Sequence, residues 1–180
     1  MFQLTTSRLR LIPLSYEQLV LLSKSRNELE KQLGLVASQL ELNAPDEFLS
    51  EYRDALLNFC IPMVKLHEDH YAWYTHWLIV LEDRQLVIGG IGLSGLPDNE
   101  GGVMTGYFID KKFEGQGYAT EAVRCLTSWI FKNPLVHKVV ADTLIDGRGS
   151  QKVLQHNGFQ LAGQLDGVLR WELHRSLRKQ

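Results

Sequence analysis

Cysteine, net charge and long apolar runs are all scarce in this chain of 180 residues, which has two cysteines and a formal net charge of −2. Cys60 and Cys125 lie far apart and form no metal-binding or redox spacing, which predicts free thiols, a reducing compartment and no metal site. The weak net charge gives no electrostatic basis for binding nucleic acid or an anionic membrane. No apolar run approaches the roughly 20 residues of a membrane span, and the first residues lack the features of a signal peptide. We therefore expect a cytoplasmic protein.

The remaining composition is typical of a globular protein with one sizeable core. Hydrophobic residues make up 44% of the chain and charged residues 22%. A chain of 180 residues fits one domain. Because no internal repeat or low-complexity stretch divides it, we expect a single domain that spans residues 1–180.

A strand, a glycine loop and a helix follow one another directly in the middle of the chain. Residues 103–109 alternate as in a β-strand, and residues 119–130 carry an apolar stripe with helical spacing. Between them, Gly115 and Gly117 lack side chains, so the backbone can adopt unusual dihedral angles and lie close to a ligand. The first N–H groups of the helix have no internal partner and lie at the positive end of its dipole. The segment therefore predicts a binding site for an anion, usually a phosphate.

Two common phosphate-binding motifs do not match this loop. A dinucleotide fingerprint needs a third glycine where Thr120 stands, and a P-loop ends in Gly-Lys-Ser or Gly-Lys-Thr. Residues 112–117 instead resemble the acyl-CoA pyrophosphate loop of the GNAT N-acetyltransferases, with Lys112 where that family has Arg or Gln. Residues 117–122 resemble the helix opening of the ribosomal-protein-alanine acetyltransferase branch of that family, and residues 5–14 resemble its first strand.

A second motif, later in the chain, also resembles that family. The family carries a helix that begins with Asn-x-x-Ser and ends in Gly-Phe. Residues 147–159 match this helix at Ser150, at residues 153–154 and at residues 158–159. Gly147 replaces the Asn, which in relatives helps to hold the pantetheine arm of the cofactor.

The order of the predicted elements agrees with this resemblance. We expect a strand at 6–14, helices across 15–76, three strands within 77–109, a helix, a strand at 136–144, a second helix and a closing hairpin. Ser15 is a candidate cap of the first helix, Gly158 a candidate left-handed cap of the last, and Asp166-Gly167 the turn of the hairpin. Hairpin strands followed by alternating elements indicate a mixed sheet with helices on its faces. The expected fold is therefore α+β, the GNAT fold, with a central, mixed, mostly antiparallel sheet flanked by helices. Its helical segment 15–76 would form the acceptor side, and residues 103–159 would form the acetyl-CoA-binding core.

The resemblance implies an enzyme that moves an acetyl group from acetyl-CoA to a primary amine by direct attack in a ternary complex. The amine would belong to a protein N-terminus or to a small molecule. A backbone N–H near Phe108 or Ile109 would face the thioester oxygen at a splay between two strands, and the loop amides would bind the pyrophosphate. The expected cofactor-binding residues are Phe108, Ile109, Lys112, Phe113, Glu114, Gly115, Gln116, Gly117, Tyr118, Ala119, Thr120, Gly147 and Ser150.

The sequence offers several candidates for the acid and the base and does not choose among them. Many relatives protonate the thiolate with a Tyr where this chain has Leu154; others use a Ser at the position of Ser150, which is equally well explained as a helix cap. A carboxylate often found on the central strand is replaced by Met104. Asp142 lies in an otherwise apolar strand and is a candidate base, although a cationic partner would explain it as well. His70 is another candidate base.

Histidines and aromatic residues are concentrated at residues 67–77, after Pro62, which we expect to interrupt any helix. They would suit an aromatic wall around an acceptor pocket, with His70 or His76 as a base. Core packing at a helix–strand junction is the alternative, and the histidine spacing alone does not indicate a metal. The expected acceptor-binding residues are Tyr71, Trp73, Tyr74 and His76.

A second function stays open because the family's Tyr, Asn and strand carboxylate are all replaced. It is an acyl-CoA-binding protein that has lost efficient catalysis. The glycine loop and Ser150 favour the enzyme, whereas an interaction module without a ligand would not need Gly115 and Gly117. Dimers are frequent in the family, so a homodimer is also left open.

Overall fold

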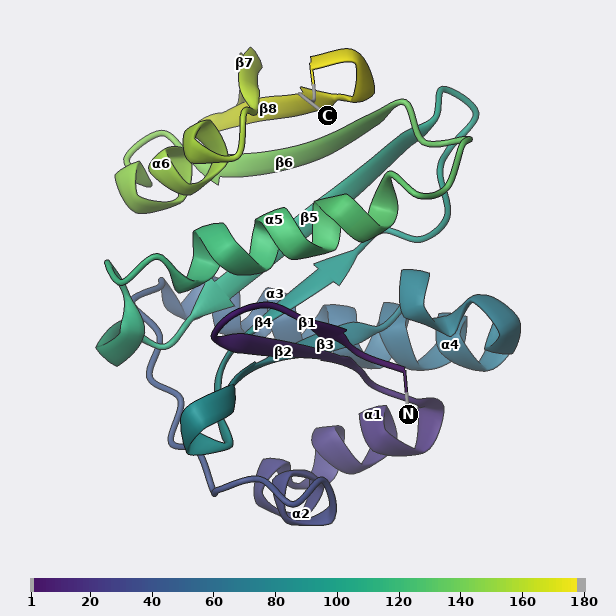
Figure 1. The fold of residues 1–180 in the computed structure, drawn as a ribbon, viewed down its shortest axis with the longest axis vertical. Helices are drawn as coiled ribbons and strands as arrows, with labels where there is room; N and C mark the ends of the chain where they lie inside the picture. The colour runs from purple at the N-terminus through teal and green to yellow at the C-terminus, as the bar shows by residue number, and fades with distance from the viewer. Residues whose placement is uncertain (1, 178–180) are drawn as a thin grey trace.

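One mixed sheet of eight strands runs through the molecule, with helices on both of its faces (Figure 1). The structure is a computed structural model that describes residues 2–177. The strand order is β1-β2-β3-β4-β5-β6-β8-β7, and every neighbouring pair is antiparallel except β5 and β6. In that order the strands are β1 (Leu4–Thr5), β2 (Leu9–Pro13), β3 (His76–Leu81), β4 (Leu86–Leu93), β5 (Gly102–Ile109), β6 (Lys138–Leu144), β8 (Val168–His174) and β7 (Gln160–Leu165). The expected α+β fold is confirmed.

The helices are divided between the two faces of the sheet. Helices α5 and α6 lie on one face, whereas α3 and α4 lie on the other (Figure 1). The α-helices are α1 (Tyr16–Lys24), α2 (Arg26–Gln32), α3 (Asp46–Ala55), α4 (Ile61–Leu66), α5 (Tyr118–Ile130) and α6 (Arg148–His156). A π-helical turn, η1 (Leu56–Cys60), joins α3 to α4, and short 3₁₀ turns are η2 (Glu68–Trp73), η3 (Glu82–Arg84), η4 (Lys111–Phe113) and η5 (Arg175–Leu177). Within residues 2–177, no helix is both long and apolar enough to cross a membrane.

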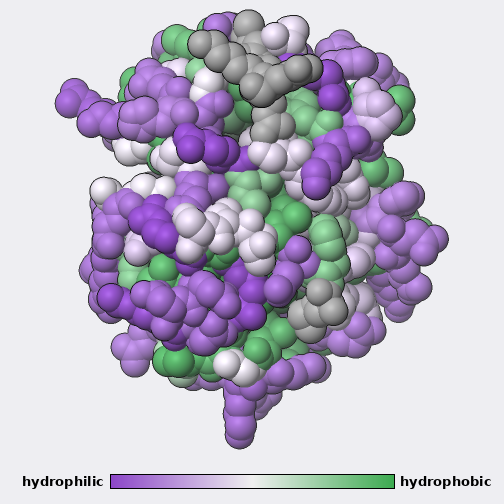
Figure 2. All heavy atoms as spheres, in the orientation of Figure 1, coloured by the Kyte–Doolittle hydropathy of each residue, from purple (hydrophilic) through white to green (hydrophobic). Residues whose placement is uncertain are grey.

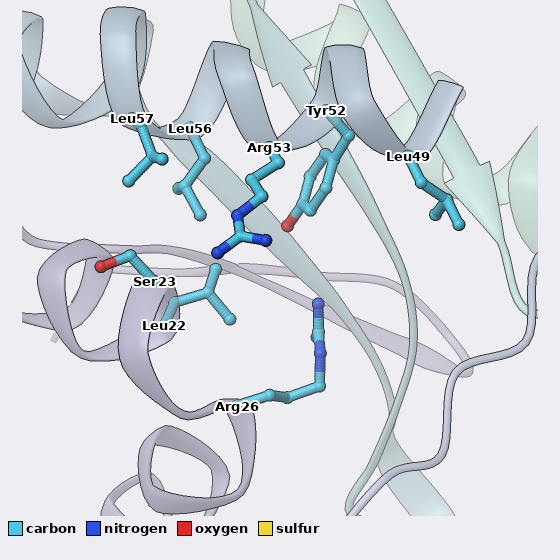
Figure 3. Close-up of a pocket in the computed structure, with 8 residues that line it drawn as sticks. All are labelled: Leu22, Ser23, Arg26, Leu49, Tyr52, Arg53, Leu56 and Leu57. Carbon is cyan, nitrogen blue, oxygen red and sulfur yellow. The ribbon is translucent and has the colours of Figure 1, made fainter. Parts of the chain in front are cut away.

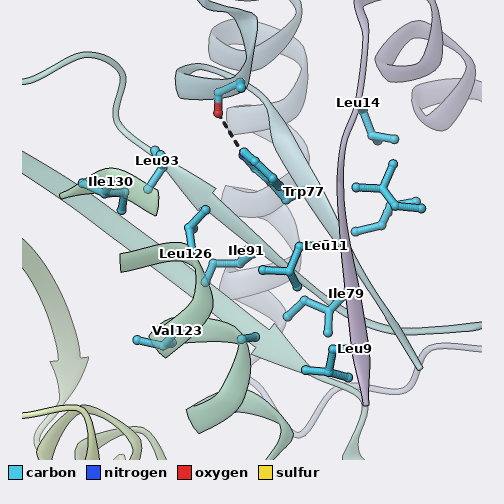
Figure 4. Packing of buried hydrophobic residues seen from close by; sticks show 14 of the residues in the cluster. Leu9, Leu11, Leu14, Trp77, Ile79, Ile91, Leu93, Val123, Leu126 and Ile130 are labelled. Atoms are coloured by element: carbon cyan, nitrogen blue, oxygen red, sulfur yellow. Dashed lines mark hydrogen bonds between the residues drawn. The ribbon is translucent and has the colours of Figure 1, made fainter. Parts of the chain in front are cut away.

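The main core lies between α5 and the sheet. Val123, Leu126 and Ile130 of α5 face Leu11 and Ile91, and all five side chains are completely buried (Figure 4). Burying an aliphatic side chain of this size contributes about 1.5–3 kcal/mol, so this layer holds α5 firmly at its place over the central strands. On the face shown in Figure 2, hydrophilic side chains predominate and apolar atoms appear in patches between them.

Capping residues and turns fix the ends of several elements. Ser15 forms a capping box with Gln18 at the start of α1, as its position before that helix predicts. Gly158 has a φ of +83° just after α6, the left-handed cap expected there. Asp166 and Gly167, with φ of 47° and 82°, make the predicted turn between β7 and β8.

The expectation that Pro62 interrupts a helix is wrong. The chain passes from α3 through η1 directly into α4, and Pro62 lies in the first turn of α4. Proline has no N–H to donate, and just before it the N–H of Ile61 bonds five residues back to the Leu56 carbonyl. The π-helical turn supplies the adjustment that a proline inside a regular helix would need.

Candidate active site

The two central strands part in the middle of the sheet. β5 and β6 are aligned over three residue pairs only, between residues 102–104 and residues 138–140. Beyond these pairs, β5 continues beside β4 alone and β6 continues beside β8 alone. The expected splay is therefore present, and the facing backbone groups of both strands are left without a partner strand.

The register determines which N–H groups of β5 face this opening. The backbone N–H of Asp110 donates to the carbonyl of Ile88, near the start of β4. Residues of an antiparallel pair alternate between bonded and non-bonded positions, so the N–H of Phe108 is also directed to β4. The N–H groups of Tyr107 and Ile109 therefore point toward the opening. Of the two residues predicted to face a thioester, only Ile109 has this orientation.

The glycine loop after β5 leaves an unblocked helix N-terminus. Gly115 and Gly117 have φ of 73° and 83°, which residues with a side chain rarely adopt. A Cβ on Gly115 would meet no atom within 4 Å, so the space beside it is open. Gly117 precedes α5 without any side-chain cap, which leaves the first amides of a 13-residue helix available. These features fit the phosphate groups of a CoA molecule.

Two lysines at this loop are paired with one carboxylate from the acceptor-side segment. The Nζ atoms of Lys111 and Lys112 lie 2.7 Å and 3.3 Å from the Glu41 carboxylate. The hydrogen bond from Lys111 is the largest cause of a lowered pKa for Glu41. All three side chains are about half exposed, and ion pairs at such exposed positions contribute little to stability. Lys112, predicted to bind the cofactor, can therefore exchange Glu41 for a phosphate at little cost.

An ion pair joins the first strands to the helix opening. Arg8 donates from Nε to Glu121 at 2.7 Å and from Nη1 to the Gln116 carbonyl at 3.1 Å, and its guanidinium lies 4.3 Å from the centre of the Tyr118 ring. Burial raises the pKa of Glu121, but hydrogen bonds from Thr6 and Arg8 outweigh burial and lower it overall. Sequence reasoning missed this contact, although the two segments that it joins were both singled out as family-like.

Tyr107 connects the opening to the start of α6. Its hydroxyl donates to the Ser150 carbonyl at 3.2 Å, and burial raises the pKa of the Tyr107 hydroxyl. Helix α6 begins at Arg148 after Gly147, so Ser150 lies inside its first turn and is not the cap. No hydrogen bond from the Ser150 hydroxyl is found among residues 2–177. Sequence reasoning missed Tyr107, which the alternation of β5 already placed on the α5 side of the sheet.

Asp142 has a cationic partner on the neighbouring strand. Its carboxylate accepts two hydrogen bonds from Arg170, at 3.0 Å and 2.8 Å, and the two residues are direct partners between β6 and β8. The alternative that a cation explains Asp142 therefore has direct support, with Arg170 as that cation. No hydrogen bond or ion pair joins Asp142 to Ser150 or to His70, within residues 2–177.

The predicted acceptor cluster divides between the two faces of the sheet. Trp73 is buried against Trp129 of α5, with ring centroids 4.7 Å apart. Tyr74 stacks on His67 at 4.5 Å and is buried. His70 is exposed on η2, where Tyr71 is half-buried. These positions favour core packing for Trp73, and they do not bring the candidate base His70 to the opening.

His76 is the member of that cluster that reaches the central strand. Its ring stacks on Phe108 of β5, with centroids 5.9 Å apart, and its Nε2 lies 3.4 Å from the Tyr52 hydroxyl of α3. Burial, together with the positive charge of Arg26, lowers the pKa of His76 to about 3. The imidazole is therefore neutral at pH 7 and too weakly basic to hold a proton there.

Glycines leave bare backbone next to these two rings. A Cβ on Gly90 would overlap the rings of His76 and Phe108, so their stacking requires glycine there. Gly92 of β4 pairs with Gly106 of β5, and a Cβ on Gly106 would meet nothing within 4 Å. The α3 side of the opening thus has an open floor of glycine backbone with aromatic walls. We call this surface, formed by Gly92, Gly106, His76 and Phe108, the glycine floor.

Comparison with known proteins identifies the family of this chain. The model of the acetyltransferase (GNAT) domain matches residues 8–160. The chain is similar to a protein of Bacillus subtilis (strain 168), the uncharacterized N-acetyltransferase YjdG, with 30% identity over 161 residues that cover 89% of this chain and 91% of that one.

Solved structures share the fold at lower identity. Ribosomal-protein-S5-alanine acetyltransferase from Vibrio fischeri aligns with a TM-score of 0.66 and 16% identity, over 99% of this chain and 100% of that one. RimL, a ribosomal L7/L12 alpha-N-protein acetyltransferase in complex with coenzyme A, aligns with a TM-score of 0.65 and 18% identity, over 96% and 98% of the two chains. At these identities the likeness establishes a common fold.

Proposed function

The chain belongs to the GNAT acetyltransferase family of acetyl-transferring enzymes, and we propose that it acetylates a primary amine with acetyl-CoA by direct attack in a ternary complex. The observation that carries this proposal is the splay of β5 and β6 beside the unblocked N-terminus of α5. Backbone N–H groups are aimed at both places, and acyl transfer depends on such fixed donors. Acetyl-CoA, when bound, supplies an activated thioester.

The chain itself holds and orients the reactants. The amides that follow Gly115 and Gly117 would bind the pyrophosphate, with Lys112 as a nearby cation, and the N–H of Ile109 would face the thioester oxygen. The glycine floor would admit the amine from the α3 side of the sheet. Positioning of this kind removes much of the entropic barrier of a reaction between two bound molecules.

Proton transfer has its best local candidates at the start of α6. The Ser150 hydroxyl donates no hydrogen bond within residues 2–177, and Tyr107 holds the Ser150 backbone through its own hydrogen bond. Asp142 and His70 stay candidate bases. However, the Asp142 carboxylate is hydrogen-bonded to Arg170, and His70 is exposed on η2. A pocket that admits a neutral amine from solvent would need no strong base on the protein.

The acceptor is an amine of a protein N-terminus or of a small molecule. YjdG is named as an N-acetyltransferase, and the two aligned structures are named as acetyltransferases of ribosomal proteins. The net charge of −2 gives this chain no general attraction for basic ribosomal proteins. The substrate class must therefore be decided by the residues around the glycine floor.

A second function is binding of acyl-CoA without efficient transfer. Leu154, which stands where many relatives have a Tyr, is fully buried and has no proton to donate to the thiolate. Met104 is exposed where a carboxylate is common. These two residues favour the binding protein, whereas the glycine floor beside the opening favours the enzyme, because a binding protein needs no acceptor site.

Titration of the protein with acetyl-CoA by calorimetry, followed by thiol release with a panel of amines and peptide N-termini, tests both functions. We expect binding and thiol release with one acceptor class. Binding without release on any acceptor would favour the binding protein. Absence of binding would overturn the assignment of the glycine loop.

A further inference from the structure

A pocket between α1 and α3 contains two arginines and is separated from the glycine floor by the side chain of Tyr52. Its volume is about 270 Å³, and it is lined by residues of α1, the first residue of α2, α3 and η1 (Figure 3). Four leucines form half of the wall, and Ser23 and Tyr52 complete it beside the arginines. Arg26 and Arg53 point into this space from opposite sides (Figure 3). None of the residues that line it is acidic.

Neither arginine has an acidic partner in the part of the chain that the structure describes, and of the two only Arg53 is exposed to solvent. The Nη1 atom of Arg26 is buried and has no hydrogen-bond partner among residues 2–177. A buried polar group without a partner is costly, and two cations that share a pocket add repulsion. An anion between them would remove both penalties through charge-assisted hydrogen bonds.

Tyr52 connects this pocket to the glycine floor. It lines the pocket, its hydroxyl lies 3.4 Å from Nε2 of His76, and its ring centroid lies 5.2 Å from that of Phe108. The Arg26 side chain hydrogen-bonds to Tyr52. Burial lowers the pKa of His76, and the positive charge of Arg26 adds to this effect. Tyr52 therefore stands between the pocket and the bare backbone beside β5, and a molecule that occupies both places must pass beside its ring.

We propose that the acceptor amine carries an anionic group, a carboxylate or a phosphate ester, which binds between Arg26 and Arg53 while the amine lies over the glycine floor. This inference rests on the proposed acetyl transfer and names its substrate class. Polyamines, which have only cationic groups, are then poor acceptors because the same arginines repel them. The leucines of the pocket wall contact the carbon chain between the amine and the anion.

Matched acceptors test the proposal through acetyl transfer. Thiol release is measured with O-phosphoethanolamine against ethanolamine, and with dipeptides that end in a free carboxylate against their amides. Within each pair, we expect kcat/KM to be at least tenfold higher for the anionic acceptor, mainly because its KM is lower. With spermidine we expect a low rate. R26Q and R53Q should each remove most of this preference. For the neutral acceptors, kcat/KM of each variant should stay within twofold of the wild-type value. The matched control is R124Q, which removes an exposed arginine of α5.

A binding measurement decides the proposal whether or not any acceptor in the panel reacts. Inorganic phosphate and glutarate are titrated by calorimetry into the protein saturated with acetyl-CoA. We expect at least one to bind, with a dissociation constant raised tenfold or more in R26Q and R53Q and unchanged in R124Q. No binding of either anion, or equal binding by all variants, would overturn the anion site.

The acetyl-CoA titration separates the two possible failures. If every variant binds acetyl-CoA with wild-type affinity and anionic acceptors show no advantage, the anion site is wrong and the proposed acetyl transfer stands. If the wild-type protein does not bind acetyl-CoA, the proposed transfer fails first. Thermal unfolding of R26Q and R53Q against R124Q shows that a lost preference does not come from lost folding.

Discussion

The cofactor core, residues 103–159, and the acceptor-side segment, residues 15–76, build their parts of the site in different ways. In the cofactor core the candidate contacts are backbone groups: the N–H groups of Tyr107 and Ile109 and the amides that begin α5. In the acceptor-side segment they are side chains, such as Arg26 and Tyr52, from helices separated by turns and a π-helical insertion. The first kind of site needs a particular backbone shape, and the second needs particular side chains brought together.

This difference explains why the two regions are unequally visible in the sequence. A backbone site requires glycines at fixed spacing between a strand and a helix, so its signal is local and continuous. A site of side chains is assembled across the fold, and its members carry no common spacing. The regions meet at two places, where Glu41 pairs with Lys111 and Lys112 and where Tyr52 contacts Phe108.

Replacing Gly115 tests the backbone site most directly. G115V fills the open space beside the loop, and we expect acetyl-CoA affinity to fall by about 100-fold or more, which is about 2.8 kcal/mol. G167V is the matched control, since Gly167 also has a positive φ, 82°, and an open surround, but lies in the β7–β8 turn. Both variants carry a left-handed strain of roughly 1–2 kcal/mol. Equal affinity in both, measured by calorimetry, would contradict a phosphate site at the loop.

His76 makes the side-chain site sensitive to acid. Burial lowers its pKa from 6.5 to about 3 in the folded protein. Below pH 6.5, His76 is therefore protonated in the unfolded chain and stays neutral in the folded protein. Stability therefore falls as the pH decreases through this window. Between pH 7.5 and 5.5 the loss is about 1.4 kcal/mol in the free energy of unfolding.

The variant H76N should remove this contribution. Urea unfolding at the two pH values gives the comparison, with H156N as a control because His156 is exposed on α6. If H76N keeps the full wild-type loss of stability, His76 is not the buried neutral group that the structure describes.

The Arg8–Glu121 pair tests whether a side chain supports the backbone site. R8Q removes the ion pair and the hydrogen bond to the Gln116 carbonyl, so we expect about 0.5–1 kcal/mol less stability and a several-fold loss of acetyl-CoA affinity. R170Q breaks a comparable pair with Asp142 on β6 and should leave acetyl-CoA affinity unchanged. Similar affinities for the two variants in calorimetry would show that Arg8 does not shape the loop.

Of these variants, the replacement of Glu41 should change acetyl-CoA affinity the least. E41Q frees Lys111 and Lys112 for phosphate groups, so acetyl-CoA should bind about two- to threefold more tightly at low salt, and the gain should vanish at high salt. E51Q, which removes an exposed carboxylate of α3, controls for net charge. A gain of the same size in both variants would mean that general charge, not the pairing, is responsible.

Local signals predicted much of the fold. The period-two alternation of residues 103–109 gave β5, the Ser15 cap gave α1, and the turn residues 166–167 gave the closing hairpin. Ser25, which caps α2 with Glu28 in its first turn, carried a readable signal that was missed. Pro62 was misjudged because its effect depends on where the helix around it begins.

The acid, the base and the acceptor residues were not predictable in the same way. Asp142 looked like an isolated charge until β8 placed Arg170 opposite it. Trp73 and His76 are three residues apart, yet they lie on opposite sides of the sheet because Trp73 ends η2 and His76 begins strand β3. The partners of a side chain come from other strands and helices. The local sequence does not determine how those elements are placed.

The sequence by itself determined that a strand, a positive-φ glycine loop and a helix would meet, because their dihedral preferences and spacing are properties of consecutive residues. Only the tertiary structure decided that β5 and β6 part after three residue pairs. It also brought Arg26, Tyr52 and His76 into one row from three separate elements. Such contacts depend on how whole elements pack, since burial and charge act through space and not along the chain.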